Sequence, residues 1–406
     1  MRRIAFVAPF LRGSTQRFLQ GFYGLADTDL CVITMEPVDS IPPSVRGRLT
    51  DVVRVMDAGD PRQLAEAVQT MTRRTGPVDA LVGFLEQLQL PIAEARELVG
   101  LPGMRADVAR GFRDKDVMKA RLRKVGLPVA KSRLVGNVEE ALAFAKEVGF
   151  PVVCKPPAGA GAKSTWRVND ANEMAAVFAA MRVAEGTGVQ CEEFVVGREQ
   201  TAESAMVDGK VVWRSGTAYV PSPLMVLENP WMQYCVLLPR ETDDPEFTTF
   251  HPTSDAALEA LGMVTGFAHM EWFRTADGRG VISEVGCRPP GANIMPLMGL
   301  AHGCDMYARW AELVAWDRFS PPVRSAAAGT VFFRGKGKGR VVAVHGLAQA
   351  QEEVGRYVVD ASLPTPGQPA ADGYEGEGYA IVKAPTTREA SHALARLVRL
   401  IQVELG

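Results

Sequence analysis

The 406-residue sequence predicts a protein of mixed α/β and α+β class with three structural units. Strands that alternate with helices predict a parallel α/β domain over residues 1–112. Two Asp-Gly pairs, at 208–209 and 277–278, lie between strand-like runs and predict antiparallel hairpins in a second unit, residues 113–320. Residues 321–406 combine strand-like runs with an amphipathic last helix, which predicts a small α+β domain.

Composition excludes several partner classes. The net charge of −2 gives no general attraction to nucleic acid or to an anionic membrane. No window is long and apolar enough to span a bilayer, and the apolar run at the start is too short for a signal peptide. The six cysteines have neither C-x-x-C nor zinc spacing, so reduced thiols in a cytoplasmic protein are the simplest account. We therefore expect no nucleic-acid partner and no membrane partner.

In the first unit, strands are expected at residues 2–9, 30–35 and 78–83, with a helix at 91–99. Glu86 follows the third strand, at the edge where open parallel sheets present ligand-binding residues. A surface glutamate is the simpler alternative at this position.

An amphipathic helix is expected from residue 113, with Val117, Met118, Leu122 and Val125 on its apolar side. Lys115 stands at its beginning, where the helix dipole favours anions. An anionic group held nearby would explain this lysine, and a solvated lysine would do so equally well.

A strand at residues 152–154 leads to Lys155 and then to a loop of small residues that includes Gly159, Gly161 and Ser164. Glycine lets backbone N–H groups approach phosphate oxygens, and Lys155 adds a positive charge. The loop matches neither the Walker pattern nor G-x-G-x-x-G. It is therefore interpreted as a flexible cover over nucleotide phosphates, with a plain hairpin tip as the structural alternative.

Three acidic residues, Glu192, Glu193 and Glu199, border an apolar strip that is expected to be a strand. Carboxylates accept hydrogen bonds from the amino group and the ribose hydroxyls of an adenosine. These residues are therefore candidates for binding a nucleoside.

Residues 217–254 contain many prolines together with aromatic residues and are hard to assign to regular structure. Long irregular segments in compact proteins tend to be binding loops, and the aromatic content disfavours disorder. Glu228, Trp231 and His251 are candidates for shaping a substrate pocket there.

The rest of the chain predicts one helix at 299–316 and, in the third unit, a last helix at 387–403. The basic run 334–340 is interpreted as an exposed turn between strands. The strands expected in this unit are 329–334, 340–346 and 379–384.

The hairpin at residues 267–285 carries Glu271 and Glu284, which are expected on one face. Two such carboxylates repel by about 4 kcal/mol at an effective dielectric near 20, so a cation is expected between them. Mg²⁺ fits, because it is held by one or two carboxylates and completed by phosphate oxygens and water. Arg288, four residues after Glu284, could hold a phosphate or carboxylate beside the metal. A hairpin with solvated charges is the alternative.

Taken in order, Lys115, Lys155 with its glycine-rich loop, the run CEEFVVGRE and the Glu271/Glu284/Arg288 hairpin resemble the ATP-grasp superfamily. The resemblance covers most of the chain and is strongest to the carboxylate–amine ligases that join L-amino acids. Biotin carboxylase and glycinamide ribonucleotide synthetase resemble it more distantly. The resemblance implies an ATP-grasp fold with a mobile lid subdomain at about residues 131–190, and a homodimer.

The resemblance also implies a role for each motif. Lys115 and Lys155 would contact the phosphates of ATP, and the loop with Gly159, Gly161 and Ser164 would close over them. Near the nucleoside, the expected contacts are the adenine amino group for Glu192, the ring edge for the backbone of Glu193 and Val195, and the ribose for Glu199.

At the reaction centre, the resemblance implies that Glu271 and Glu284 carry Mg²⁺, or Mn²⁺ in its place. Arg288 and Lys155 would stabilise the transferred phosphoryl group. Gly286 stands where many members of the superfamily have a metal-binding Asn, which leaves the number of metal ions open.

The function implied is ATP-dependent formation of an amide or peptide bond through an acyl phosphate, with an amino acid substrate. One alternative is a ligase of central metabolism that activates bicarbonate or formate, or that joins glycine to a ribosylamine. The other is a nucleotide-binding module without catalysis. The identity of both substrates is left open by the sequence.

Overall fold

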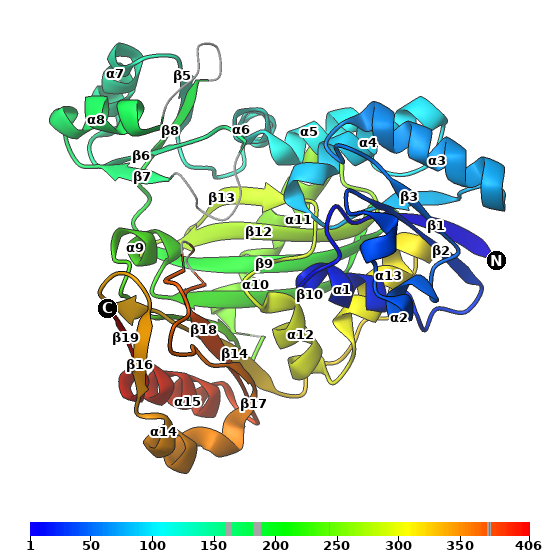
Figure 1. The fold of residues 1–406 in the computed structure, drawn as a ribbon. Helices are drawn as coiled ribbons and strands as arrows, with labels where there is room; N and C mark the ends of the chain where they lie inside the picture. The colour runs from blue at the N-terminus through cyan, green and yellow to red at the C-terminus, as the bar shows by residue number, and fades with distance from the viewer. Residues whose placement is uncertain (159–164, 182–187, 243, 372, 374) are drawn as a thin grey trace.

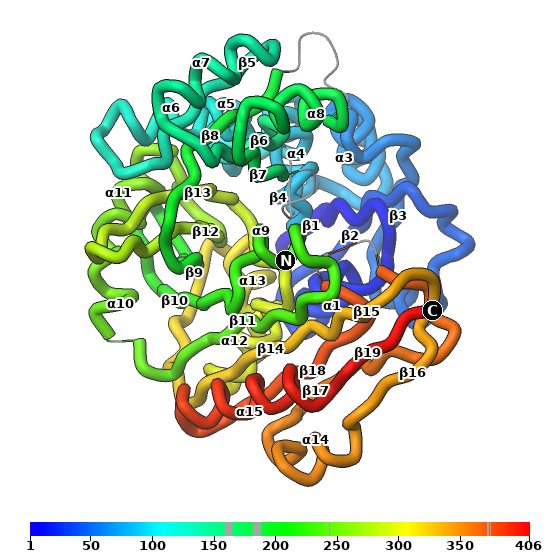
Figure 2. Tube along the Cα trace, turned by 90° about the vertical axis from the view of Figure 1, so that its left-hand side faces the viewer, coloured from blue at the N-terminus to red at the C-terminus, as the bar shows by residue number. Residues whose placement is uncertain are grey.

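Four β-sheets organise the part of the chain that the structure describes, which is residues 1–406 without 159–164, 182–187, 243, 372 and 374. The structure is a computed structural model. Figure 1 shows the largest sheet in the middle of the molecule, with the N-terminal domain along one side of it. A smaller sheet with two helices and the C-terminal helices lie at opposite ends of the molecule, as Figure 2 also shows.

The N-terminal sheet is parallel, as expected, but it has four strands where three were predicted. The missed strand, β3, has only two buried residues, so its sequence lacks the apolar run of a buried strand. In the sheet order β3-β2-β1-β4, the strands are β1 (Arg2–Val7), β2 (Thr28–Thr34), β3 (Asp51–Arg54) and β4 (Ala80–Val82). The helices of this region are α1 (Ser14–Gln20), α2 (Pro43–Arg46), α3 (Pro61–Thr75), α4 (Gln89–Val99) and α5 (Ala106–Arg113).

The two faces of this sheet pack into different cores. Ala5 and Val7 share a cluster with residues of α3 and α4. On the other face, Phe6 packs against Trp310, with ring centroids 6.2 Å apart. Trp310 belongs to a helix more than two hundred residues further along the chain, so this contact joins the N-terminal domain to the main body.

A second, antiparallel sheet has the strand order β5-β8-β6-β7, and we keep the name lid subdomain for this sheet and its two helices. Helix α6 (Lys115–Lys124) precedes it in the chain. The elements of the lid subdomain are β5 (Ser132–Val135), α7 (Val138–Val148), β6 (Val152–Lys155), β7 (Trp166–Val168), α8 (Ala171–Met181) and β8 (Val189–Glu193).

The largest sheet has eight strands in the order β13-β12-β9-β10-β11-β14-β18-β17, and all its neighbours are antiparallel. Both predicted hairpins, β9–β10 and β12–β13, lie in it. Strands from both sides of the expected boundary at residue 320 belong to this sheet, and the domain boundaries stay predictions. The strands are β9 (Arg198–Val207), β10 (Lys210–Val220), β11 (Tyr234–Leu238), β12 (Gly266–Arg274), β13 (Gly280–Gly286), β14 (Ala327–Phe333), β17 (Val358–Ser362) and β18 (Gly378–Ala384).

The predicted single helix at 299–316 is wrong, because the structure has α12 (Ile294–His302) and α13 (Met306–Trp316) there. Gly303 ends α12 in the left-handed conformation at φ 63°, which glycine adopts without strain. The carboxylate of Asp305 then caps α13 by accepting hydrogen bonds from two backbone N–H groups. The apolar pattern of the sequence continues from α12 into α13, so it did not reveal the break between these two helices.

The last helix, α15 (Thr387–Leu400), also ends earlier than predicted, and β19 (Gln402–Leu405) follows it. β19 lies between β15 (Gly335–Lys336) and β16 (Val341–His345) in a three-stranded sheet. The remaining α-helices are α9 (Pro223–Glu228), α10 (Pro245–Thr248), α11 (His251–Leu261) and α14 (Leu347–Val354). The first two lie in the segment 217–254 that resisted assignment, and α11 begins in it.

Candidate active site

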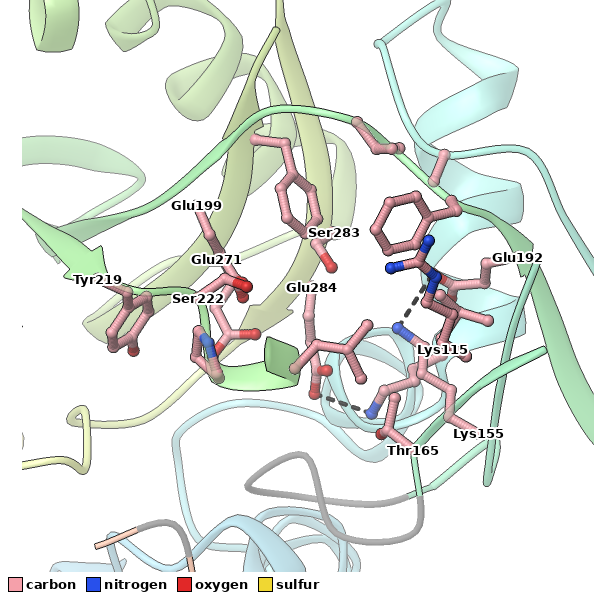
Figure 3. Close-up of a pocket in the computed structure, with 18 of the residues that line it drawn as sticks. Lys115, Lys155, Thr165, Glu192, Glu199, Tyr219, Ser222, Glu271, Ser283 and Glu284 are labelled. Atoms are coloured by element: carbon pink, nitrogen blue, oxygen red, sulfur yellow. Dashed lines mark hydrogen bonds and ion pairs between the residues drawn. The ribbon is translucent and has the colours of Figure 1, made fainter. Parts of the chain in front are cut away.

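A cavity lies between the lid subdomain and the face of the large sheet near its β13 edge. Its walls come from segments far apart in the sequence: β6 and β8 of the lid subdomain, the start of α6, the β12–β13 hairpin, α9 and the turn after β4. Figure 3 shows the side chains of Lys115, Lys155, Glu192, Glu271 and Glu284 gathered around this cavity.

Strand alternation places a row of polar side chains on the sheet face below the cavity. Residues two apart in a strand share a face, so Glu199 and Glu203 of β9 project together, as do His269 and Glu271 of β12. In the register of the sheet, His269 lies opposite Glu203, and Glu271 lies opposite Glu284. The predicted hairpin with its two glutamates on one face is confirmed.

His269 links two of these carboxylates. Its Nδ1 is 3.0 Å from Glu203 Oε1, and its Nε2 is 3.6 Å from Glu271 Oε1. Burial disfavours the charged ring, but the two carboxylates outweigh this effect and raise the pKa of His269 to about 9. Burial would raise the pKa of Glu271, yet the contacts with His269 and the field of Arg288 lower it. Glu271 is therefore held as a carboxylate.

Lys115 is buried at the start of α6, and its Nζ contacts Glu284 Oε1 at 2.9 Å. The solvated-lysine alternative is wrong, and an anion does lie beside this lysine. The capping residue Asp114, which accepts hydrogen bonds from two N–H groups of the first turn, supplies the negative charge that the helix dipole favours. Val125 is exposed, so the apolar side of α6 is shorter than predicted.

Sequence reasoning missed Lys119, one helical turn after Lys115. Its side chain is completely buried, and its Nζ lies 2.7 Å from Glu192 Oε2. The same carboxylate oxygen lies 3.0 Å from Lys155 Nζ. Although burial acts against ionisation, the two lysines lower the pKa of Glu192. No sequence signal marks Lys119, because a lysine in a charged helix is ordinarily solvated.

Unlike Glu271, Glu199 is held in its neutral, protonated form. It is buried beside that ionised carboxylate, and burial followed by the repulsion from Glu271 raises its pKa to about 8. Near neutral pH, Glu199 therefore keeps its proton and can both donate and accept a hydrogen bond.

This protonation predicts a pH-dependent stability effect in the protein without nucleotide. A carboxyl group whose pKa is raised by folding opposes folding above its ordinary value of 4.5, and the opposition grows until the pH reaches the folded pKa. We expect Glu199→Gln to raise the free energy of unfolding on the order of 2 kcal/mol near pH 9 and far less near pH 5. Urea unfolding at the two pH values measures the difference, with the exposed Glu259→Gln of α11 as control. An equal gain at both pH values would contradict the protonated state.

Glu86 and Arg288 form a partly buried ion pair in the lining of the cavity. Arg288 Nε donates to Glu86 Oε2 at 2.5 Å, and the surface interpretation of Glu86 is wrong. Gly286 makes room for this pair, because a Cβ at that position would lie 3.3 Å from Glu86 Oε2. The carboxylate of Glu86 thus lies directly beside Gly286.

Helix α9 lines the cavity. Figure 1 shows this helix between the lid subdomain and the C-terminal elements. Of the three residues expected to shape a substrate pocket, Glu228 lines the cavity, whereas Trp231 and His251 are not among its lining residues. Arg334 holds the end of α9 by donating to Val226 O at 2.6 Å. Arg334 and Gly335 are buried, so the predicted exposed turn at 334–340 is wrong at its first two residues.

The remaining sequence candidates fall into two groups. Glu193 and Val195 line the cavity, and the carboxylate of Glu193 accepts a hydrogen bond from Lys131 N at 2.8 Å. Gly159, Gly161 and Ser164 lie outside the residues that the structure describes.

Cys287, which follows the glycine beside Glu86, is buried, and burial raises the pKa of its thiol to about 12. A protonated thiol is a poor nucleophile, so Cys287 acts here as a packed side chain. All six cysteines are free.

Among the helices of the described residues, none combines the length and the apolar character needed to cross a bilayer.

Comparison with known proteins gives the relationships of the chain. Residues 114–202 match the family model described as the ATP-binding domain of the carbamoyl-phosphate synthase L chain. A Bacillus subtilis protein described as an L-arginine-specific L-amino acid ligase is 22% identical over 249 residues, which are 60% of this chain and 59% of that protein. The chain thus aligns with less than two thirds of that relative.

Solved structures resemble the whole chain. The crystal structure of an L-amino acid ligase from Bacillus licheniformis has a TM-score of 0.77 at 17% identity, covering 100% of this chain and 99% of that one. The biotin carboxylase domain of the Hydrogenobacter thermophilus 2-oxoglutarate carboxylase, in complex with magnesium ADP and bicarbonate, has a TM-score of 0.67 at 16% identity, covering 98% and 90%. The chain therefore has the ATP-grasp fold, and its resemblance to the ligases of that superfamily is confirmed.

Proposed function

We propose that the chain is an ATP-dependent ligase that joins the carboxylate of an amino acid to an amine through an acyl phosphate. One observation carries this proposal: a single cavity combines two opposed carboxylates, Glu271 and Glu284, with the basic groups of Lys115, Lys155 and Arg288. Phosphates require the basic groups, and a divalent cation requires the carboxylates. A module that only binds a nucleotide needs no opposed pair of acids.

The two carboxylates fit Mg²⁺. Glu271 and Glu284 face each other across the hairpin, and Glu271 is held ionised. The described residues contain no group of three or more His, Cys, Asp or Glu side chains that could hold a metal, so substrate phosphates and water must complete the coordination. Glu271 and Glu284 would hold the ion, which supplies charge neutralisation for the phosphate oxygens when bound. Gly286 contributes no side-chain ligand, and Mn²⁺ could take the same place.

The lid-side wall of the cavity suits an adenosine. Glu192 Oε1 is buried and accepts no hydrogen bond among the described residues, so it can accept one from the adenine amino group. The backbone near Glu193 and Val195 borders the same wall. Glu199, which keeps its proton, can both donate to and accept from a ribose hydroxyl. These features support ATP as the nucleotide.

The ion pair of Arg288 and Glu86 suits an amino acid. A free amino acid carries a carboxylate and an ammonium group close together, and the pair offers a cation and an anion 2.5 Å apart in the same cavity. Arg288 would take the carboxylate, and Glu86 would take the ammonium group. This complementarity favours an amino acid over bicarbonate or formate, which have no positive group for Glu86.

The reaction then needs two transfers. A carboxylate oxygen attacks the γ-phosphorus, the bond from that phosphorus to the β,γ-bridging oxygen breaks, and ADP leaves. Arg288 and Lys155 stabilise the negative charge on the transferred group. The amine nitrogen next attacks the acyl carbon, the bond from that carbon to the phosphate oxygen breaks, and the nitrogen loses a proton. The products are an amide, ADP and phosphate, and no protein residue becomes acylated.

ADP release with a panel of amino acid pairs tests the proposal, with bicarbonate, formate and a phosphoribosylamine plus glycine as further arms. We expect turnover to require ATP, Mg²⁺ and at least one amino acid pair, and mass spectrometry of the product should show an amide. If ATP binds but only bicarbonate, formate or the ribosylamine stimulates turnover, the central-metabolism alternative is correct. If no arm stimulates turnover, the catalytic proposal fails.

We also propose a cytoplasmic homodimer, as the resemblance implies. Sedimentation of the purified chain at micromolar concentration measures the state directly, and a monomer there would contradict the dimer.

A further inference from the structure

The carboxylate of Glu192 is shared by two lysines that occupy different positions. Lys155, on β6 of the lid subdomain, lines the cavity, and Lys119, on α6 behind it, does not. Both Nζ atoms approach the same carboxylate oxygen, at 3.0 Å from Lys155 and 2.7 Å from Lys119. Glu192 is thus a junction between α6 and two strands of the lid subdomain.

Lys119 does not line the cavity, so it cannot contact a bound ligand directly. Its side chain is completely buried, and its Nζ forms an ion pair with Glu192. Burying a charged lysine costs free energy. An opposite charge close to its ammonium group is needed to offset that cost. Burial lowers the pKa of Lys119 to about 8 against the opposing pull of Glu192, so the amine still carries its proton near neutral pH.

We propose that Lys119 is a positioning residue for nucleotide binding, whose charge holds Glu192 and thereby frees Lys155 to contact the phosphates. With both lysines present, the junction has two cations for one anion. When Lys155 turns toward a phosphate, Glu192 keeps Lys119 as its partner. Without Lys119, the same movement would leave a buried carboxylate unpaired, which is strongly unfavourable. This inference rests on the nucleotide-binding half of the proposed function and not on ligation.

The charge of Lys119 can be tested with ADP and adenosine as probes, because only ADP has phosphates. The ratio of the two dissociation constants, measured by calorimetry, reports the phosphate contacts separately from the adenine contacts. In Lys119→Met, which keeps the length of the side chain, we expect ADP to bind about tenfold more weakly or worse. Adenosine should change less than about threefold. Lys124→Met removes a charge from the exposed side of the same helix and should change neither constant.

A second variant separates positioning from a general structural role. In Lys119→Met combined with Glu192→Gln, no carboxylate remains to retain Lys155, so the ratio of adenosine to ADP constants should return toward that of the wild type. If Lys119 only supported the fold, the two substitutions would add their losses. Should Lys119→Met alone fail to fold, the double variant is compared with Glu192→Gln, where loss of Lys119 should leave the ratio unchanged.

Equal losses of ADP and adenosine binding, no loss of either, or no recovery in the double variant would each overturn the positioning role. Wild-type protein that binds no ADP would overturn this inference together with the proposed function. Wild-type protein that binds ADP with the expected ratios but forms no amide would contradict the ligase proposal alone.

Discussion

Glu284→Gln is expected to lower ATP-dependent ligation by at least about a hundredfold. Glutamine has the shape of glutamate without its charge, so one of the two carboxylates that face each other at the proposed metal position is lost. The ion pair between Lys115 and Glu284 is lost at the same time. The rate of ADP release at saturating substrates, measured over a series of Mg²⁺ concentrations, gives the effect, and added Mg²⁺ should restore only part of it.

The control for this variant is Asp277→Asn in the same hairpin. It makes the same carboxylate-to-amide change in the turn between β12 and β13, where the side chain is 57% exposed. Ligation should stay near the wild-type rate. If Glu284→Gln retained full turnover, or if both variants lost it equally, the hairpin would not be the reaction centre.

Arg288→Lys is expected to lower the turnover number by about a hundredfold while changing the apparent affinity for ATP far less. Arginine makes two directed contacts here, from Nε to Glu86 and from Nη1 to the backbone oxygen of Pro289. The ammonium of lysine cannot reproduce this planar arrangement, so the group that should meet the transferred phosphoryl would be displaced. Steady-state kinetics with ATP and the best amino acid pair separates the two parameters.

Arg279→Lys at the exposed hairpin tip is the matched control and should leave both parameters unchanged. A variant of Arg288 that changed only the apparent affinity for ATP would place this arginine at the nucleotide and not at the transferred group.

The parts of the site that depend on local signals could be predicted from the sequence. An Asp-Gly pair between apolar runs predicts a hairpin, and the hairpin is present. The pairing of Glu271 with Glu284 also depends on a register shift between Glu271 and Trp272, which no sequence signal marks. The parallel N-terminal sheet followed from strands that alternate with helices. In each case the contact partners lie close in the chain, or the pattern repeats within one element.

The parts that depend on distant contacts could not be predicted. Glu86 and Arg288 meet across 202 positions, and neither has a neighbour that marks it as buried. Lys119 lies in a helix rich in exposed charges, and only the approach of Glu192 from the lid subdomain explains its burial. Arg334 was predicted on an exposed turn because a basic run with glycines is usually solvated. Its guanidinium instead donates a hydrogen bond to the backbone of α9.

Transfer of oxygen from the substrate carboxylate to phosphate tests the central claim most directly. The amino acid that is activated is labelled with ¹⁸O in its carboxylate, and the phosphate released with ADP is examined by mass spectrometry. An acyl phosphate requires one labelled oxygen in each phosphate molecule, because the carboxylate oxygen that attacks the γ-phosphorus leaves with it. Amide formation that releases unlabelled phosphate, or that places the label in AMP, would contradict this reaction for the chain.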